Sequence, residues 1–358
     1  MDVPLWVWLV TAVAVVALVV FDFFAHVRTP HEPTFRESAW WSTAYIGLAL
    51  AFGVAVGVVW DWGHAGEYFA GYVTEKSLSV DNLFVFLIIM TRFAVPRVYQ
   101  QKVLLVGVVI ALVLRTVFIL VGAAAIEQFS WVFYVFGAFL LYTAVKLVRE
   151  HDDEPLDEQA AHREDGLVVR WLKRVVPTTD RYHDDRLTAR VDGRRVLTPM
   201  LVVMVAIGST DVLFALDSIP AIYGLTTQPY IVFTANAFAL LGLRQLYFLI
   251  GGLLERLVYL AQGLAVILGF IGVKLVLHAL HTNELPFVNG GEPVDWAPEI
   301  PTWLSLAVIL ATLAVATVAS LAATRGSGGA TAPVAPADVA VARPDPAAVA
   351  APETPNEN

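Results

Sequence analysis

Two acidic clusters lie inside apolar stretches that are long enough to cross a bilayer. Each cluster reads as an acid, five further residues, an aspartate and a small polar residue. Their members are Glu75, Asp81 and Asn82 in the first cluster and Asp211, Asp217 and Ser218 in the second. A carboxylate at the centre of a bilayer costs about 2.5–3.5 kcal/mol on insertion scales, so four of them require a partner or a function. Carboxylate, amide and hydroxyl oxygens suit hard cations such as Mn²⁺, Mg²⁺ or Ca²⁺, so the pattern predicts a divalent-cation site with these six ligands.

The composition is that of a membrane protein. Apolar residues make up 58% of the sequence, whereas about 45–50% is usual for a soluble domain, and the mean hydropathy is +0.67. The chain has no cysteine, so disulfides and thiolate metal sites are excluded. We expect an all-α polytopic membrane protein with about nine spans, at roughly 4–24, 40–60, 67–90, 102–122, 130–148, 198–223, 231–251, 257–279 and 302–322.

The basic residues predict the orientation of the chain. The chain has 23 lysine and arginine residues. Those within the predicted spans are Lys76, Arg115, Lys146, Arg244 and Lys274, and the others fall only in alternate loops and in the C-terminal tail. The positive-inside rule then predicts a multi-pass protein of the plasma (inner) membrane, with its N-terminus external and its C-terminus cytoplasmic.

Short blocks of sequence recur in the same order in the two halves of the chain. Residues 114–122 resemble residues 243–251, and Val145–Val148 resembles Val273–Val276. Because three spans is an odd number, the second copy would enter the membrane from the opposite side, which gives two inverted three-helix repeats. The layout we predict is two N-terminal transmembrane helices (1–66), a first repeat (67–149), a cytoplasmic loop (150–197), a second repeat (198–280), an external loop with the last transmembrane helix (281–325) and a disordered tail (326–358).

Helix geometry places a constraint on the acidic clusters. Six residues rotate an α-helix by about 240° in net terms, so the two acids of each cluster would face different directions. If one direction were lipid, the cost would be too high, and we therefore expect a broken or bent helix at each cluster. Residues 77–79 and Pro220 are the expected soft points.

An alternative is that the acids form structural ion pairs with basic residues of the spans. The candidate charge partners or gates are Lys76, Arg115, Arg244 and Lys274, although Lys274 also lies near a span end, where a lysine can snorkel. The chain shows no phosphate-binding loop, nucleophile triad or metalloprotease helix, so we do not expect an enzyme, a permanently bound cofactor or a nucleic-acid partner. The expected partners are the lipid bilayer and a divalent metal ion. Two other functions stay open: a non-transporting membrane scaffold that acts through the 150–197 loop and the tail, and an exporter of a cationic organic solute.

The two clusters and their flanks resemble a known family. Gly71–Phe86 resembles the first signature of the TerC family of integral membrane proteins, which includes the Alx-type proteins, and Asp211–Ile222 with Phe233–Arg244 resembles the second. The likeness extends over about residues 21–279. It implies manganese export in metal homeostasis, with links to alkaline pH and tellurium stress in some members.

Carried onto this chain, the resemblance points to the same four acids, with Asn82, Ser218 and Asn236 as neighbours. One departure from the family pattern is Gly208, because many members carry a glutamate at that position. We expect Asp81 and Asp217 to be the central ligands of an exported Mn²⁺ ion. Glu75 and Asp211 would be second ligands or groups that exchange a proton, as a proton antiporter with alternating access requires.

Overall fold

The computed structural model describes residues 1–27, 33–129, 131–153, 187–191, 194–254, 257–283, 285, 288–294 and 296–326. Within these residues the chain is helical apart from one strand pair, which confirms the predicted all-α polytopic class. The first half contains α1 (Leu5–Asp22) with the π-helix η1 (Phe23–Val27), α2 (Phe35–Val59), α3 (Trp62–Arg92), α4 (Arg97–Gln128) and α5 (Val132–Asp153). The second half contains α8 (Pro199–Tyr223), α9 (Pro229–Leu240), α10 (Leu243–Leu254), α11 (Leu260–His281), the 3₁₀ turn η2 (Asn289–Gly291) and α12 (Thr302–Gly326).

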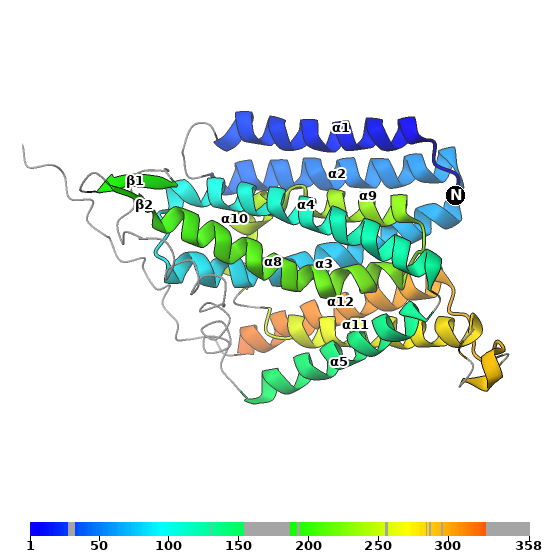
Figure 1. The fold of residues 1–358 in the computed structure, drawn as a ribbon. Coiled ribbons are helices and arrows are strands. Elements are labelled where there is room, and N and C mark those ends of the chain that lie inside the picture. The colour runs from blue at the N-terminus through cyan, green and yellow to red at the C-terminus, as the bar shows by residue number, and fades with distance from the viewer. Residues whose placement is uncertain are drawn as a thin grey trace, which may run out of the picture.

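Eight segments of the described chain are long and apolar enough to cross a membrane. The remaining predicted span lies in α3, whose charged residues keep it outside that group. At 31 residues, α3 is about 46 Å long, which exceeds the roughly 30 Å of the hydrocarbon core. Figure 1 shows the helices side by side, with α1 and α2 at one edge and α5, α11 and α12 at the other.

The expected break at each acidic cluster is wrong, and the alternative of a bent helix stays a prediction. α3 and α8 each continue through their cluster as one α-helix, and Pro220 is accommodated inside α8. None of the described residues of α3 from His64 to Met90 is exposed, and Glu75 and Asp211 are both buried. The unbroken helices therefore keep Glu75 and Asp211 buried without any break in the α-helical backbone.

The interrupted helix is the seventh predicted span, where α9 ends and α10 begins. Leu241 is extended and Gly242 has a φ of +78°, a conformation that favours glycine. A Cβ at Gly242 would also lie only 2.9 Å from Cβ of Tyr45. Lys76 of α3 donates from Nζ to the carbonyl oxygens of Ala239 at 3.0 Å and Leu241 at 3.5 Å. The lysine thus satisfies carbonyls that the break leaves without helical partners.

Burial separates central helices from peripheral ones. In the most apolar window of the Pro229–Leu249 segment, 83% of the residues are buried, against 17% for Leu5–Ala25 and 17% for Thr302–Thr324. Tight helix crossings use glycine, as is common in membranes. A Cβ at Gly137 of α5 would lie 3.0 Å from the carbonyl oxygen of Gly272 in α11, so α5 and α11 pack with their backbones close together.

The helix pairing is the one that an inverted repeat would produce. α3 packs against α9, α8 packs against α4, and α5 packs against α11. α3 and α8 also run in opposite directions (Figure 1). The two-fold relation itself stays a prediction.

The predicted cytoplasmic loop is described only at its two ends. α5 continues to Asp153, and β1 (Thr188–Val191) pairs antiparallel with β2 (Arg194–Leu197) just before α8. The rest of the loop, 154–186, and the predicted disordered tail after Gly326 lie outside the described residues.

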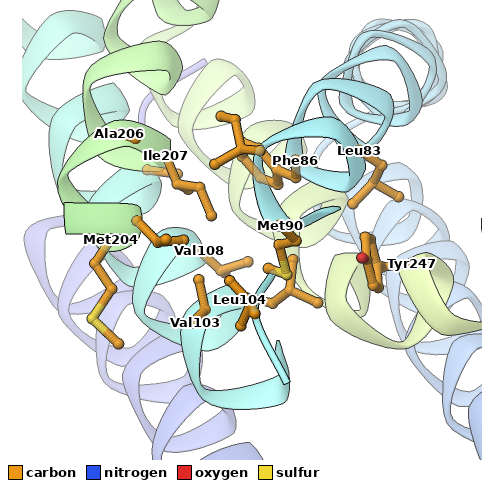
Figure 2. Close-up of a cluster of buried hydrophobic side chains, with 14 of the residues drawn as sticks. Leu83, Phe86, Met90, Val103, Leu104, Val108, Met204, Ala206, Ile207 and Tyr247 are labelled. Atoms are coloured by element: carbon orange, nitrogen blue, oxygen red, sulfur yellow. The ribbon is translucent and has the colours of Figure 1, made fainter. Parts of the chain in front are cut away.

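A large apolar cluster joins the central helices on the side of the strand pair. Figure 2 shows Met90 of α3 beside Leu104 of α4, and the same cluster includes Phe86 of α3, Ile207 of α8 and Tyr247 of α10. We call this group the inner apolar cluster. On α3 its members follow the first acidic cluster, and on α8 they precede the second, so it lies to one side of both.

Candidate functional site

Glu75, Arg115 and Asp211 meet in the middle of their helices. All three side chains are almost completely buried. The Arg115 guanidinium forms an ion pair with Glu75 of α3 through Nη1, and its Nη2 donates to Oδ1 of Asp211 in α8 at 3.4 Å. One arginine of α4 therefore contacts one carboxylate from each acidic cluster, and we call these three residues the charged centre.

Helix geometry explains which cluster residues join the charged centre. Seven residues rotate an α-helix by about 700°, so positions 75 and 82 share a face of α3. With its amide oriented to satisfy its neighbours, Asn82 accepts from Nη2 of Arg115 at 3.1 Å and donates to the Leu78 carbonyl at 3.1 Å. Asp211 and Ser218 have the same spacing on α8, so each cluster presents an acid and a small polar residue on one face.

Several polar atoms of the charged centre and of neighbouring positions on α3, α8 and α9 are buried and have no hydrogen-bond partner among the described residues. They are Oε2 of Glu75, Oδ2 of Asp211, the hydroxyls of Thr74, Ser79 and Ser218, and both amide atoms of Asn236. Buried polar groups are normally paired, so this concentration is unusual. All but one of these atoms are oxygens, the ligand type that hard divalent cations prefer.

The side chains of Asp81 and Asp217 lie outside what the structure describes, so their predicted role as central ligands stays a prediction. Their backbone positions are informative. α3 and α8 are antiparallel, and six residues advance a helix by about 9 Å. The backbone of Asp81 therefore lies between the charged centre and the end of the molecule that carries the strand pair. The backbone of Asp217 lies on the opposite side of the charged centre. The described side chains contain no group of three or more His, Asp or Glu residues that could hold a metal ion.

Apolar layers close the charged centre on both sides. The inner apolar cluster lies on the side of the strand pair. On the other side Ile119 of α4, Ile219 and Tyr223 of α8 and Val232 of α9 pack together, and we call them the outer apolar cluster. The Tyr223 hydroxyl donates to the Ile119 carbonyl at 2.6 Å. The structure therefore shows the charged centre occluded.

A second buried network lies at the start of α10, and sequence reasoning missed most of it. Asp22, at the end of α1, accepts through Oδ1 from Nη2 of Arg244 at 2.8 Å and from Nε2 of Gln245 at 2.8 Å. The Tyr45 hydroxyl donates to the same oxygen at 3.2 Å, and Arg244 donates to Oε1 of Gln101 at 2.7 Å. The sequence signal was available, because Asp22 is a lone acid between Phe21 and Phe23.

The other basic candidates have partners away from the acidic clusters. Lys76 contacts the backbone at the α9–α10 break, and Lys274 of α11 donates to the Ser305 hydroxyl of α12 at 3.2 Å. Among the described contacts, Arg115 is the basic residue that the structure brings to Glu75 and Asp211. Gly208 faces Ile110 of α4, because a Cβ there would lie 3.3 Å from that side chain.

The fold and the charged centre define a polytopic helical membrane protein with ionised residues buried between its central helices. The chain belongs to the integral membrane protein TerC family, whose model matches residues 60–327. This confirms the resemblance seen in the two signatures.

Three relatives at substantial identity carry names that describe them as membrane proteins or membrane-bound. An uncharacterized membrane protein of Mycobacterium tuberculosis is 52% identical over 320 residues, covering 89% of this chain and 80% of the relative. A Myxococcus xanthus membrane protein is 40% identical over 267 residues, covering 74% and 81%. The Escherichia coli K12 protein Alx is 41% identical over 275 residues, covering 74% and 84%, and its name proposes it as a membrane-bound redox modulator. No solved structure matches the chain significantly.

Proposed function

We propose that this protein exports Mn²⁺ from the cytoplasm across the plasma membrane, by alternating access and in exchange for protons. The observation that carries the proposal is the charged centre, because it places two carboxylates and one arginine at mid-helix between apolar layers. Ionised groups at this depth typically mark an ion pathway.

The chemistry of the site favours a hard divalent cation. The charged centre holds buried carboxylate oxygens of Glu75 and Asp211, further buried hydroxyl and amide oxygens lie on α3, α8 and α9, and the sequence contains no cysteine. Mg²⁺ and Ca²⁺ prefer the same ligands, so the choice of Mn²⁺ comes from the family resemblance. The positions of Asp81 and Asp217, on opposite sides of the charged centre, suit successive stations along one path.

The name of the Alx relatives suggests a role in redox balance as a second candidate function. This sequence contains no cysteine, so a thiol–disulfide mechanism within it is excluded. A redox effect of this protein would therefore follow from what it transports or from its partners.

The test is total cellular manganese under manganese load. Cells that lack the protein would be complemented with wild type, Asp211→Asn or Asp217→Asn. We expect wild type to lower manganese and both variants to leave it at the level of the deficient cells, since each loses a charge from an acidic cluster.

The matched control is Asp61→Asn, the same chemical change outside the spans. Asp61 caps α3 by accepting from the His64 N–H at 2.9 Å, which lowers the pKa of Asp61, and asparagine caps a helix equally well. This variant should export as wild type does. If wild type restores stress tolerance without changing any divalent metal, the scaffold becomes the leading account. Competition by amines but not by divalent ions would favour an organic cation.

The proposed orientation can be tested with two single cysteines, because the natural sequence has none. Leu187, beside the strand pair, and Trp296, between α11 and α12, are both exposed. Trp296→Cys should react with a membrane-impermeant maleimide on intact cells, and Leu187→Cys only after the membrane is opened. The reverse labelling pattern would place the N-terminus in the cytoplasm and overturn the proposed orientation.

A further inference from the structure

We infer that Arg115 is a tethered counter-ion which the transported cation must displace, and which drives the cation out of the site when it returns. This inference rests on the proposed function. It adds that Arg115 determines which cation charge the site selects and how the bound cation is released. Arg115 is fully buried and contacts carboxylates from two different helices, Glu75 of α3 and Asp211 of α8.

The charges of the described centre favour a divalent cargo. Two carboxylates face one guanidinium, so the guanidinium balances only one of their two charges. A divalent cation that took the place of Arg115 would balance both. A monovalent cation would restore only the charge that Arg115 already supplies, so it would gain little by displacing the arginine.

Arginine and metal cannot occupy the centre together. Both need the carboxylate oxygens of Glu75 and Asp211, and two cations within a few ångströms repel each other strongly in a buried site. Binding of a metal ion therefore requires Arg115 to withdraw. When Arg115 returns, it competes for the same oxygens and weakens the hold on the metal.

The contacts of Arg115 are those of an exchangeable partner. A purely structural buried ion pair needs its remaining donors and acceptors satisfied to offset desolvation. Here Nε of Arg115, Oε2 of Glu75 and Oδ2 of Asp211 have no hydrogen-bond partner among the described residues. The contact between Nη2 of Arg115 and Oδ1 of Asp211 is also long, at 3.4 Å. Asn82 also accepts from the guanidinium, and this amide can hold Arg115 without competing for metal as a carboxylate would.

The arginine at the corresponding place in the second half provides the contrast. Arg244 makes two short hydrogen bonds, to Asp22 at 2.8 Å and to Gln101 at 2.7 Å, and it lies in a different network. Its substitution removes a buried positive charge without touching Glu75 or Asp211. Arg244→Gln is therefore the matched control for Arg115→Gln.

The experiment measures Mn²⁺ binding to the purified full-length protein by calorimetry, together with Mn²⁺ transport in proteoliposomes. We expect Arg115→Gln to bind Mn²⁺ about tenfold or more tightly than wild type, because buried charge pairs couple by more than the 1.4 kcal/mol that tenfold represents. Its transport should be slower than that of wild type, because release loses the competing charge. Arg244→Gln should leave the affinity for Mn²⁺ unchanged.

A second variant, Arg115→Lys, tests the inference if Arg115→Gln folds poorly. Arg115→Lys keeps the charge but engages one carboxylate at a time, so its affinity for Mn²⁺ should rise by a smaller factor. If folded Arg115 variants bind Mn²⁺ as wild type does or more weakly, Arg115 is only a structural partner and the inference is wrong. If neither wild type nor any variant binds Mn²⁺, the proposed function itself falls, and the inference falls with it.

Discussion

The triple variant Glu75→Gln, Arg115→Met and Asp211→Asn is expected to be about as stable as the wild type and unable to export manganese. Replacing a whole buried ion-pair group by neutral residues of similar size is often neutral or stabilising, because the desolvation cost disappears with the charges. The metal would lose both described carboxylates at the same time. Stability and transport should therefore separate in one protein.

The single variants should behave differently from the triple variant. Arg115→Met leaves two carboxylates buried without their cation, so we expect it to lower the stability by about 3–5 kcal/mol. Glu75→Gln should cost less, because Asp211 still contacts Arg115. The measurement is the midpoint of thermal unfolding of each purified variant, with manganese export measured in parallel.

Two results would contradict this account. An Arg115→Met protein as stable as the wild type would mean that the two carboxylates do not depend on the arginine. A triple variant that still exports manganese would mean that Asp81 and Asp217 bind the ion without the charged centre.

The sequence was sufficient to predict the class of protein and the identity of the family. Long apolar stretches predict transmembrane helices directly, because a single chain segment in lipid can hydrogen-bond all its backbone N–H and C=O groups only as a helix. The long signatures around Glu75 and Asp211 pointed to the TerC family, and the family match confirmed it. The sequence also offered the alternative that acids within the spans pair with basic residues within the spans. The contacts of Glu75 and Asp211 with Arg115 are pairs of this kind.

The helix breaks could not be placed from the sequence, because they depend on neighbours. The reasoning assumed that one acid of each cluster would face lipid on an unbroken helix, whereas Glu75 and Asp211 are both buried on continuous helices. At the actual break, Tyr45 packs so close to Gly242 that no Cβ fits there, and Lys76 donates to two carbonyls, and both residues come from other helices. The residues around Gly242 in the sequence do not indicate which side chains of other helices will contact it.

The same limit explains why the partner of Arg244 was missed. The internal repeat pairs Arg115 with Arg244, and symmetry alone would look for the partner of Arg244 within the first repeat. The structure supplies Asp22 from α1, a helix that the repeat does not include. The two arginines thus occupy corresponding places in the sequence and differ in what they contact.

The neutral substitution Asp22→Asn is expected to destabilise the protein by about 3–5 kcal/mol, because it removes the charge that balances a buried arginine. Asparagine is nearly isosteric with aspartate and keeps one oxygen that can accept from Arg244 and Gln245, but it supplies no negative charge to the guanidinium. Amide hydrogen exchange should rise in α10, where both residues lie. The measurements are the midpoint of thermal unfolding and the exchange rates of the purified protein.

The control variant is Thr11→Val on the same helix. Thr11 and Tyr230 share a buried hydrogen bond of 2.7 Å between their hydroxyls, which also ties α1 to the second half of the chain. A neutral hydrogen bond contributes about 0.5–1.5 kcal/mol, so Thr11→Val should cost well under half of what Asp22→Asn costs. Manganese export per folded molecule should be unchanged in both variants if Arg244 is a structural partner. If Asp22→Asn alters the transport rate of the folded protein while Thr11→Val does not, Arg244 is a gate, and α1 takes part in the transport cycle.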